Sequence, residues 1–214
     1  MGTSRKKALQ ILHDRDLAAL LSWTSNTRSS LRTLFSLSYS EDDLIGWRAI
    51  EGIGIAAMQI AKSDLEMVKD FLRRLFWLMN DESGGLSRRA PEVIGEILFG
   101  LPSLISEFGI LLFHFTREEP FERGSFSALA RISSRAPELI EENREIFLSA
   151  LDDPDPAIRV YALTALSTVE TGLVAQQVEK LLNDHALVAT YDFPTGKIIE
   201  TTVAGFAKQL ATIK

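Results

Sequence analysis

Arginines follow acidic turns at four places, and this pairing is the most regular chemical pattern in the sequence. Asp42 and Asp43 precede Arg48, and the same order of carboxylate and arginine returns three more times. The later sets are Asp81 and Glu82 before Arg88 and Arg89, Glu118 and Glu119 before Arg123, and Asp153 and Asp155 before Arg159. A carboxylate at a helix start accepts bonds from free backbone N–H groups and meets the positive end of the helix dipole. We expect these carboxylates to cap helices, and an alternative function, gripping a charged partner, stays open.

The tract from Trp77 to Arg89 is the richest in polar groups. It combines Asn, Asp, Glu and Ser with two glycines and two arginines. Such a loop could supply oxygen ligands to a hard cation or backbone N–H groups to a phosphate. The spacing of a calcium-binding EF-hand loop and that of a phosphate-binding P-loop are both missing. Tandem Arg88 and Arg89 would suit an anionic ligand, and the alternative is a plain turn between two helices.

Catalytic and metal-binding patterns are missing from the sequence. There is no cysteine, and the three histidines lie far apart at positions 13, 114 and 185. Paired carboxylates such as Glu51 and Glu92 can serve acid–base chemistry when their pKa values differ. Here Arg48 and Arg88 lie three or four positions away, so we expect each carboxylate to pair with the arginine on its own helix. The sequence predicts no catalytic residue, no metal and no cofactor.

Charge is distributed unevenly along the 214 residues, whose formal net charge is −6. Residues 1–39 carry +4 and residues 40–214 carry −10. A protein that wraps nucleic acid needs a basic face, so the acidic body argues against a nucleic-acid partner. The basic head allows one further hypothesis, in which the N-terminal helix docks on an acidic surface of a larger complex.

Helical periodicity runs through nearly the whole chain and predicts an all-α fold. Apolar residues in Leu101–Phe115 and 137–151 recur at i, i+3, i+4 and i+7. Residues 6–22 are expected to form an extra N-terminal helix, and the alternation in Leu187–Tyr191 is too short to predict a strand. No secretory signal or spanning segment is visible, because the most apolar stretch is shorter than about 20 residues. We expect a cytoplasmic protein without membrane contact.

One block carries a repeat signature. Residues 148–166, LSALDDPDPAIRVYALTAL, place an Asp/Pro turn between a leucine-rich helix end and a helix with small residues three apart. This block resembles a HEAT repeat. Small residues at positions 54, 95, 130, 167 and 207 are separated by 41, 35, 37 and 40 residues, close to the repeat length of that family. The resemblance implies one domain over 1–214, a right-handed α-solenoid with about five helical hairpins in 26–212.

The resemblance also implies a function. The second helices of such hairpins line a concave groove that binds other proteins, so we expect a non-catalytic scaffold for a protein or peptide segment of mixed charge. The expected groove residues are Trp47, Arg48, Glu51, Arg88, Arg89, Glu92, Arg123 and Tyr161. The expected ladder between successive turns includes Asp43, Asp81, Asp153 and Arg159. The alternative is a HEAT-like DNA glycosylase, for which the residues would be Trp47, Asp81, Arg88 and Arg89.

Overall fold

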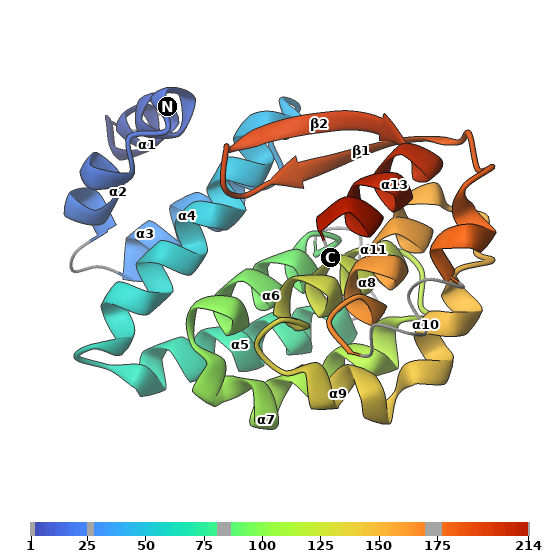
Figure 1. The fold of residues 1–214 in the computed structure, drawn as a ribbon. Helices are drawn as coiled ribbons and strands as arrows, with labels where there is room; N and C mark the ends of the chain where they lie inside the picture. Colours follow the sequence, from blue (N-terminus) through green and yellow to red (C-terminus); the bar gives the residue numbers. More distant parts are fainter. Residues whose placement is uncertain (1–2, 25–27, 81–86, 170–176, 214) are drawn as a thin grey trace.

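The computed structural model describes residues 3–24, 28–80, 87–169 and 177–213, and this part of the chain is mainly helical (Figure 1). The longer helices are α1 (Thr3–Asp14), α2 (Leu17–Thr24), α3 (Arg28–Leu37), α4 (Asp43–Ala61), α5 (Leu65–Asn80), α6 (Ala90–Gly100), α8 (Glu122–Ile132), α9 (Pro137–Glu142), α10 (Arg144–Ala150), α11 (Pro156–Leu166) and α13 (Val203–Ile213). The helical class is as predicted, but a strand pair is present as well.

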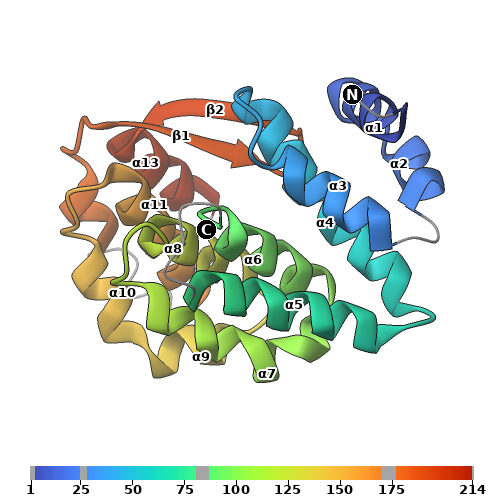
Figure 2. The same cartoon turned by 180° about the vertical axis from the view of Figure 1, so that it is seen from behind.

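Alternate helices pack side by side and form the inner layer of the molecule. Helix α4 packs against α6, α6 against α8, α8 against α11, and α11 against α13. Their outer neighbours α3, α5 and α10 pack on α4, α6 and α11 respectively. Figure 2 shows the same order from behind. One hydrophobic core cluster extends from Ala8 to Ala207 and joins these helices.

Small residues allow the inner helices to approach closely, as their spacing predicts. An added Cβ at Gly95 of α6 would stand 2.5 Å from the Ala128 Cα of α8. At Gly54 of α4, an added Cβ would lie 2.6 Å from the Glu96 side chain. Both distances are too short for a real contact, so an alanine at either position would have to displace its neighbour.

The prediction of one N-terminal helix over residues 6–22 is wrong. The chain forms α1 and α2, which meet at Arg15, a residue with φ of 50°. Residues other than glycine seldom adopt a positive φ, and a single residue in this left-handed conformation ends a helix. Asp16 then starts α2, because its side chain accepts a hydrogen bond from Ala19 N at 2.9 Å. Both helices pack on α4.

The two other apolar stretches are also more broken than predicted. Residues 101–115 form η2 (Pro102–Leu104), α7 (Ile105–Phe108) and η3 (Gly109–Phe115) rather than one α-helix. The residue before a proline is biased away from helical geometry, so α6 ends before Pro102. In 137–151, Asn143 separates α9 from α10, and its side-chain amide donates to the Leu139 carbonyl at 2.9 Å.

A β-hairpin corrects the prediction that 187–191 is not a strand. Strand β1 (Leu187–Asp192) pairs antiparallel with β2 (Lys197–Thr202), with Leu187 opposite Thr202. The connecting loop ends at Gly196, whose φ of 66° suits glycine. The hairpin extends from the end that holds α13 toward α4, and its strands lie beside the inner helices (Figures 1 and 2).

Helix α4 is long and apolar enough to span a membrane by length and composition. However, 61% of its most apolar window is buried inside the described structure. The bent pair formed by α6 and residues 102–115 passes the same test only if both parts count as one span. Core helices of globular domains have the same properties, so this composition does not point to a membrane.

Candidate binding groove

Six of the eight predicted groove residues line one cavity of about 600 Å³. The inner helices and the segment before α6 provide Trp47, Arg88, Arg89, Glu92, Arg123 and Tyr161. Across the cavity, the hairpin contributes Ala189, Ile198 and Glu200. The cavity therefore lies between the inner helix layer and one face of the hairpin. Pockets of this size are typical of binding sites for small molecules and side chains.

Two of the three arginines in this cavity are available to a ligand. Arg89 is fixed, because it forms ion pairs with Asp43 at 3.0 Å and Glu92 at 3.4 Å. Its guanidinium also lies 5.1 Å from the centre of the Trp47 ring. Arg123 is exposed and reaches Asp155 only at 3.8 Å. Arg88 is exposed too, and among the described residues it forms no ion pair.

Glu92 is a buried carboxyl in the wall of the same cavity. Its side chain is 10% exposed, and one oxygen is paired with Arg89. The other oxygen, Oε2, has no hydrogen-bond partner among the described residues and fits the notch left by Gly124. Burial raises the pKa of Glu92, and the charge of Arg89 opposes that shift. The group can therefore gain a proton more easily than an exposed glutamate can.

Tyr161 and Trp47 supply the aromatic surface of the cavity. Burial raises the pKa of the Tyr161 hydroxyl, and the charge of Arg123 opposes that shift. Trp47 is stacked on Tyr191 of the hairpin, with ring centres 5.6 Å apart and planes within 3°. One face of Trp47 is thus covered by the chain itself, which limits what a ligand can reach.

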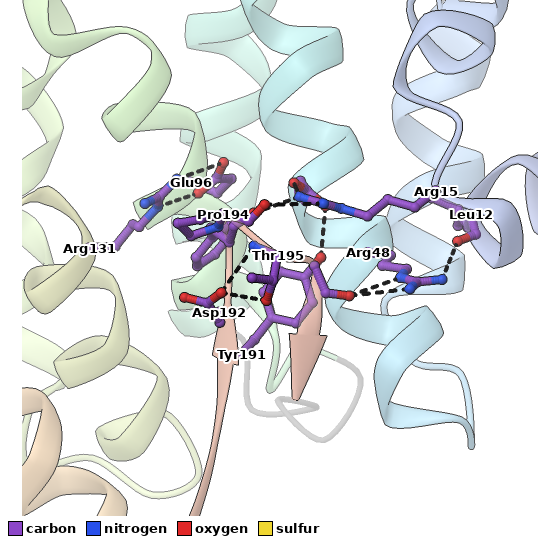
Figure 3. A network of polar contacts seen from close by, with 12 residues as sticks. Leu12, Arg15, Arg48, Glu96, Arg131, Tyr191, Asp192, Pro194 and Thr195 are labelled. Carbon is purple, nitrogen blue, oxygen red and sulfur yellow. Dashed lines mark hydrogen bonds and ion pairs between the residues drawn. The ribbon is translucent and has the colours of Figure 1, made fainter. Parts of the chain in front are cut away.

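Arg48 does not face the cavity, although the sequence places it in the groove. Its guanidinium donates to the carbonyls of Leu12 at 3.0 Å and His13 at 2.6 Å. Two further bonds, both at 3.2 Å, reach the Gly196 carbonyl at the hairpin tip (Figure 3). Arg48 therefore joins the N-terminal helices to the hairpin.

Glu51 is buried at the same junction and is also absent from the cavity lining. It is 7% exposed and accepts hydrogen bonds from Arg15 and from the Tyr191 hydroxyl, both at 2.7 Å. The Arg15 guanidinium also donates hydrogen bonds to the Phe193 carbonyl at 2.6 Å and the Pro194 carbonyl at 3.3 Å. The hydrogen bond to Glu51 raises the pKa of Arg15, and burial raises that of Tyr191. This network anchors the hairpin tip.

The carboxylates do pair with arginines, but with arginines from other segments in two cases. Glu92 binds Arg89, three residues away, whereas the predicted partner of Glu51 was Arg48 and the observed one is Arg15. Glu96, one turn after Glu92, binds Arg131 of α8 at 2.6 Å. The predicted pairs are wrong in both cases: Arg48 bonds to the hairpin tip instead of Glu51, and Glu92 pairs with Arg89, just before α6, instead of Arg88.

The predicted ladder residues serve as caps and as links between turns. Asp43 pairs with Arg89, as described above. Arg159 bonds to the Asp153 carbonyl and forms an ion pair with Asp184 at 2.7 Å. Asp42 caps α4 and Asp155 caps α11 through backbone N–H groups. Asp81 lies outside the described residues, as does the rest of the polar loop at 81–86.

Sequence reasoning missed Arg131 and its contacts with the hairpin. Arg131 is held by Glu96, and its guanidinium lies 3.5 Å from the centre of the Phe99 ring and 3.8 Å from that of Phe193. The run of β-branched residues after Lys197 and the turn Pro194-Thr195-Gly196 were the available signals for a hairpin. The residues of α4, α6 and α8 that contact the hairpin follow no local spacing rule.

Three of the four residues expected for a DNA glycosylase are described. Trp47 is stacked on Tyr191, Arg89 is ion-paired, and Arg88 is exposed at the cavity. Within the described ranges, no group of three or more acidic or histidine residues is placed to hold a metal ion. Comparison of the sequence with protein-family models and with curated proteins finds no match.

Proposed function

We propose that this protein is a non-catalytic binding scaffold whose groove holds a segment of a partner protein in the cavity between Arg88, Arg123 and the hairpin. The observation that carries the proposal is the lining of that cavity. It brings together three arginines, the carboxylates of Asp43, Glu92 and Glu200, and two aromatic rings. Arginine, tryptophan and tyrosine are the residue types that dominate binding energy at protein interfaces.

The scaffold in this proposal is a right-handed HEAT-like solenoid of about five hairpins. The consecutive packing of α4, α6, α8, α11 and α13 supports it, as does the close approach at Gly54 and Gly95. In such a solenoid the second helices of successive hairpins form one continuous surface. The cavity lies on that surface, where a segment of another chain would cross several repeats.

A partner segment of mixed charge fits the cavity better than a run of phosphates. Arg88 and Arg123 attract anionic groups, whereas exposed Glu200 repels them. A protein that grips several phosphates needs a continuous basic face. The cavity offers equal numbers of basic and acidic side chains, and the body of the chain carries −10. A cytoplasmic location, expected from the sequence, stays a prediction.

The test is capture of partners from a cell lysate with wild type and with the double variant Arg88→Glu/Arg123→Glu. Both arginines are exposed, so the variant should fold. A control variant, Arg74→Glu/Arg117→Glu, makes the same charge change at exposed residues outside this cavity. A protein that binds wild type and the control but not the groove variant, with nuclease present, supports the proposal.

Two results of this capture experiment would contradict the proposal. A partner that is lost when nuclease is added would favour nucleic-acid binding, and salt-dependent binding of duplex DNA at low ionic strength would confirm it. Partner binding that survives in the groove variant would exclude this cavity. The hypothesis of a docking N-terminal helix is tested by Lys6→Glu/Lys7→Glu, because these lysines are exposed. Deleting residues 1–23 would instead remove the core residues Ala8 and Leu12.

A further inference from the structure

The hairpin separates the arginine-lined cavity from a second cavity of about 390 Å³. Residues on a strand alternate between its two faces. Ala189, Ile198 and Glu200 face the first cavity, and Thr190, Ile199 and Thr201 line the second one. Helices α8, α11 and α13 complete the wall of the second cavity. Its size is typical of a site for a small organic group.

Hydroxyl groups at the end of α11 offer this cavity hydrogen-bond acceptors rather than donors. Thr164 donates its hydroxyl proton to the Val160 carbonyl at 2.8 Å. Ser167 and Thr168 donate theirs to carbonyls of the same helix at 2.7 Å. A hydroxyl has one proton and two acceptor lone pairs. With the proton engaged in the helix, these three side chains can only accept hydrogen bonds from a ligand.

The arginine in the lining, Arg131, is already engaged by other groups of the chain. It forms a 2.6 Å ion pair with Glu96, and the rings of Phe99 and Phe193 cover its guanidinium. A carboxylate, Asp192, also lines the cavity. Its Oδ2 accepts bonds from Thr195 N and from the Thr195 hydroxyl. A carboxylate has about four acceptor sites, so Asp192 keeps capacity for a cationic ligand.

Aromatic rings form the apolar part of the same wall. Trp47, Phe99 and Phe206 line the cavity together with rings of the hairpin. The faces of aromatic rings attract cations and pack well against alkyl chains. Acceptor oxygens, a carboxylate and aromatic faces thus surround one space, and its single arginine is paired.

We infer that the second cavity binds a protonated alkylamine, a positive –NH₃⁺ group on a short apolar stem. The ammonium group would donate hydrogen bonds to Asp192 and to the α11 hydroxyls, and the stem would lie against the rings. The same chemistry is available from a free small amine and from a lysine side chain of a partner segment. The inference does not depend on the function proposed for the first cavity.

The first test is titration of the ¹⁵N-labelled protein with n-butylammonium chloride, followed by amide chemical shifts. Saturable shifts are expected in Thr164–Thr168 and in Thr190–Phe193. n-Butanol and sodium butyrate have similar stems without the positive charge, and we expect binding at least about tenfold weaker for both. Capped lysine, N-acetyl-lysine methylamide, separates the two sources: if it binds as tightly as butylammonium, a lysine side chain of a partner is an acceptable ligand. If it does not bind, the site takes free amines.

Two variants make the inference falsifiable. Asp192→Asn should weaken butylammonium binding about tenfold. Because Asp192 also holds the hairpin turn, the near-isosteric Thr164→Val/Ser167→Ala provides a second measurement, with a loss of about threefold or more. The matched control is Thr33→Val, a threonine of α3 with the same hydroxyl-to-carbonyl bond outside this cavity. Equal binding of butanol and butylammonium, or unchanged affinity in both variants, would overturn the inference.

Discussion

At the scale of single residues, Glu96 gives the clearest pH dependence. Burial raises its pKa from an ordinary value near 4.5 to about 7, although the ion pair with Arg131 opposes the shift. The folded protein therefore keeps a proton on Glu96 that the unfolded chain has already lost. Stability from this group is complete below pH 4.5 and falls as the pH rises toward 7.

Glu96→Gln should remove this pH dependence because glutamine does not ionise. We expect the free energy of unfolding of the variant, relative to wild type, to increase by up to about 3 kcal/mol between pH 4.5 and 7. Urea denaturation at several pH values measures this difference. Loss of the charged partner of Arg131 adds an offset, so the change with pH is the diagnostic quantity. If the difference in free energy of unfolding between variant and wild type does not change between pH 4.5 and 7, the pKa of Glu96 is not raised.

The sequence shows which side chains carry charge, but local spacing did not predict which of them form ion pairs. Arg48 and Glu51 lie three positions apart on α4, where helix geometry favours a pair. Each instead bonds to groups far away in the sequence, Arg48 to Gly196 and Glu51 to Arg15 and Tyr191. These contacts exist only because the hairpin tip returns to α4. A sequence pattern read one helix at a time cannot contain that information.

At the scale of elements, the close packing of α6 on α8 depends on Gly95. An added Cβ there would meet the Cα of Ala128 at 2.5 Å and its carbonyl oxygen at 3.2 Å. Backbone atoms cannot rotate away, so Gly95→Ala must push the helices apart. We expect a loss of about 1–2 kcal/mol in the free energy of unfolding, after the helix propensity gained by alanine is counted.

Gly100→Ala is the matched control on the same helix. There the nearest atoms belong to the flexible Met58 side chain, with Cγ at 2.8 Å. Methionine adapts its shape easily, so this variant should keep its stability within about 0.5 kcal/mol of wild type. Thermal and urea unfolding of both variants compare the two sites. Equal stability of both variants would mean that α6 and α8 are not in this close contact.

The inner helices could be predicted from the sequence, and the hairpin could not. Small residues at Gly54 and Gly95 mark helix surfaces that approach each other, and this signal is local and periodic. The strands have only six residues each, and β1 carries a weak alternation. A two-stranded hairpin is marginal by itself. This one is stabilised by the stacking of Tyr191 on Trp47 and by the Glu51 network, which are long-range contacts.

At the scale of the whole molecule, the hairpin joins the two ends of the chain. Its tip is fixed by Arg15, between α1 and α2, and by Arg48 of α4. Its other end leads directly into α13, which packs on α11. The N-terminal helices and the C-terminal hairpin therefore share one set of hydrogen bonds at the hairpin tip. Their local stabilities should be coupled, and both cavities depend on this junction.

Arg15→Ala tests that coupling. Arginine and alanine have the same strain at the positive φ of residue 15, so the variant mainly removes the guanidinium bonds to Glu51, Phe193 and Pro194. We expect amide hydrogen exchange to become about tenfold faster both in 187–202 and in α1 and α2. Exchange in α9 and α10 should stay unchanged, as should all exchange in Arg32→Ala, which alters an exposed arginine of α3. If only α1 and α2 exchange faster, the hairpin is held by its own contacts with the inner helices. The groove would then be closed from the C-terminal side alone, because the junction with the N-terminal helices would contribute nothing to it.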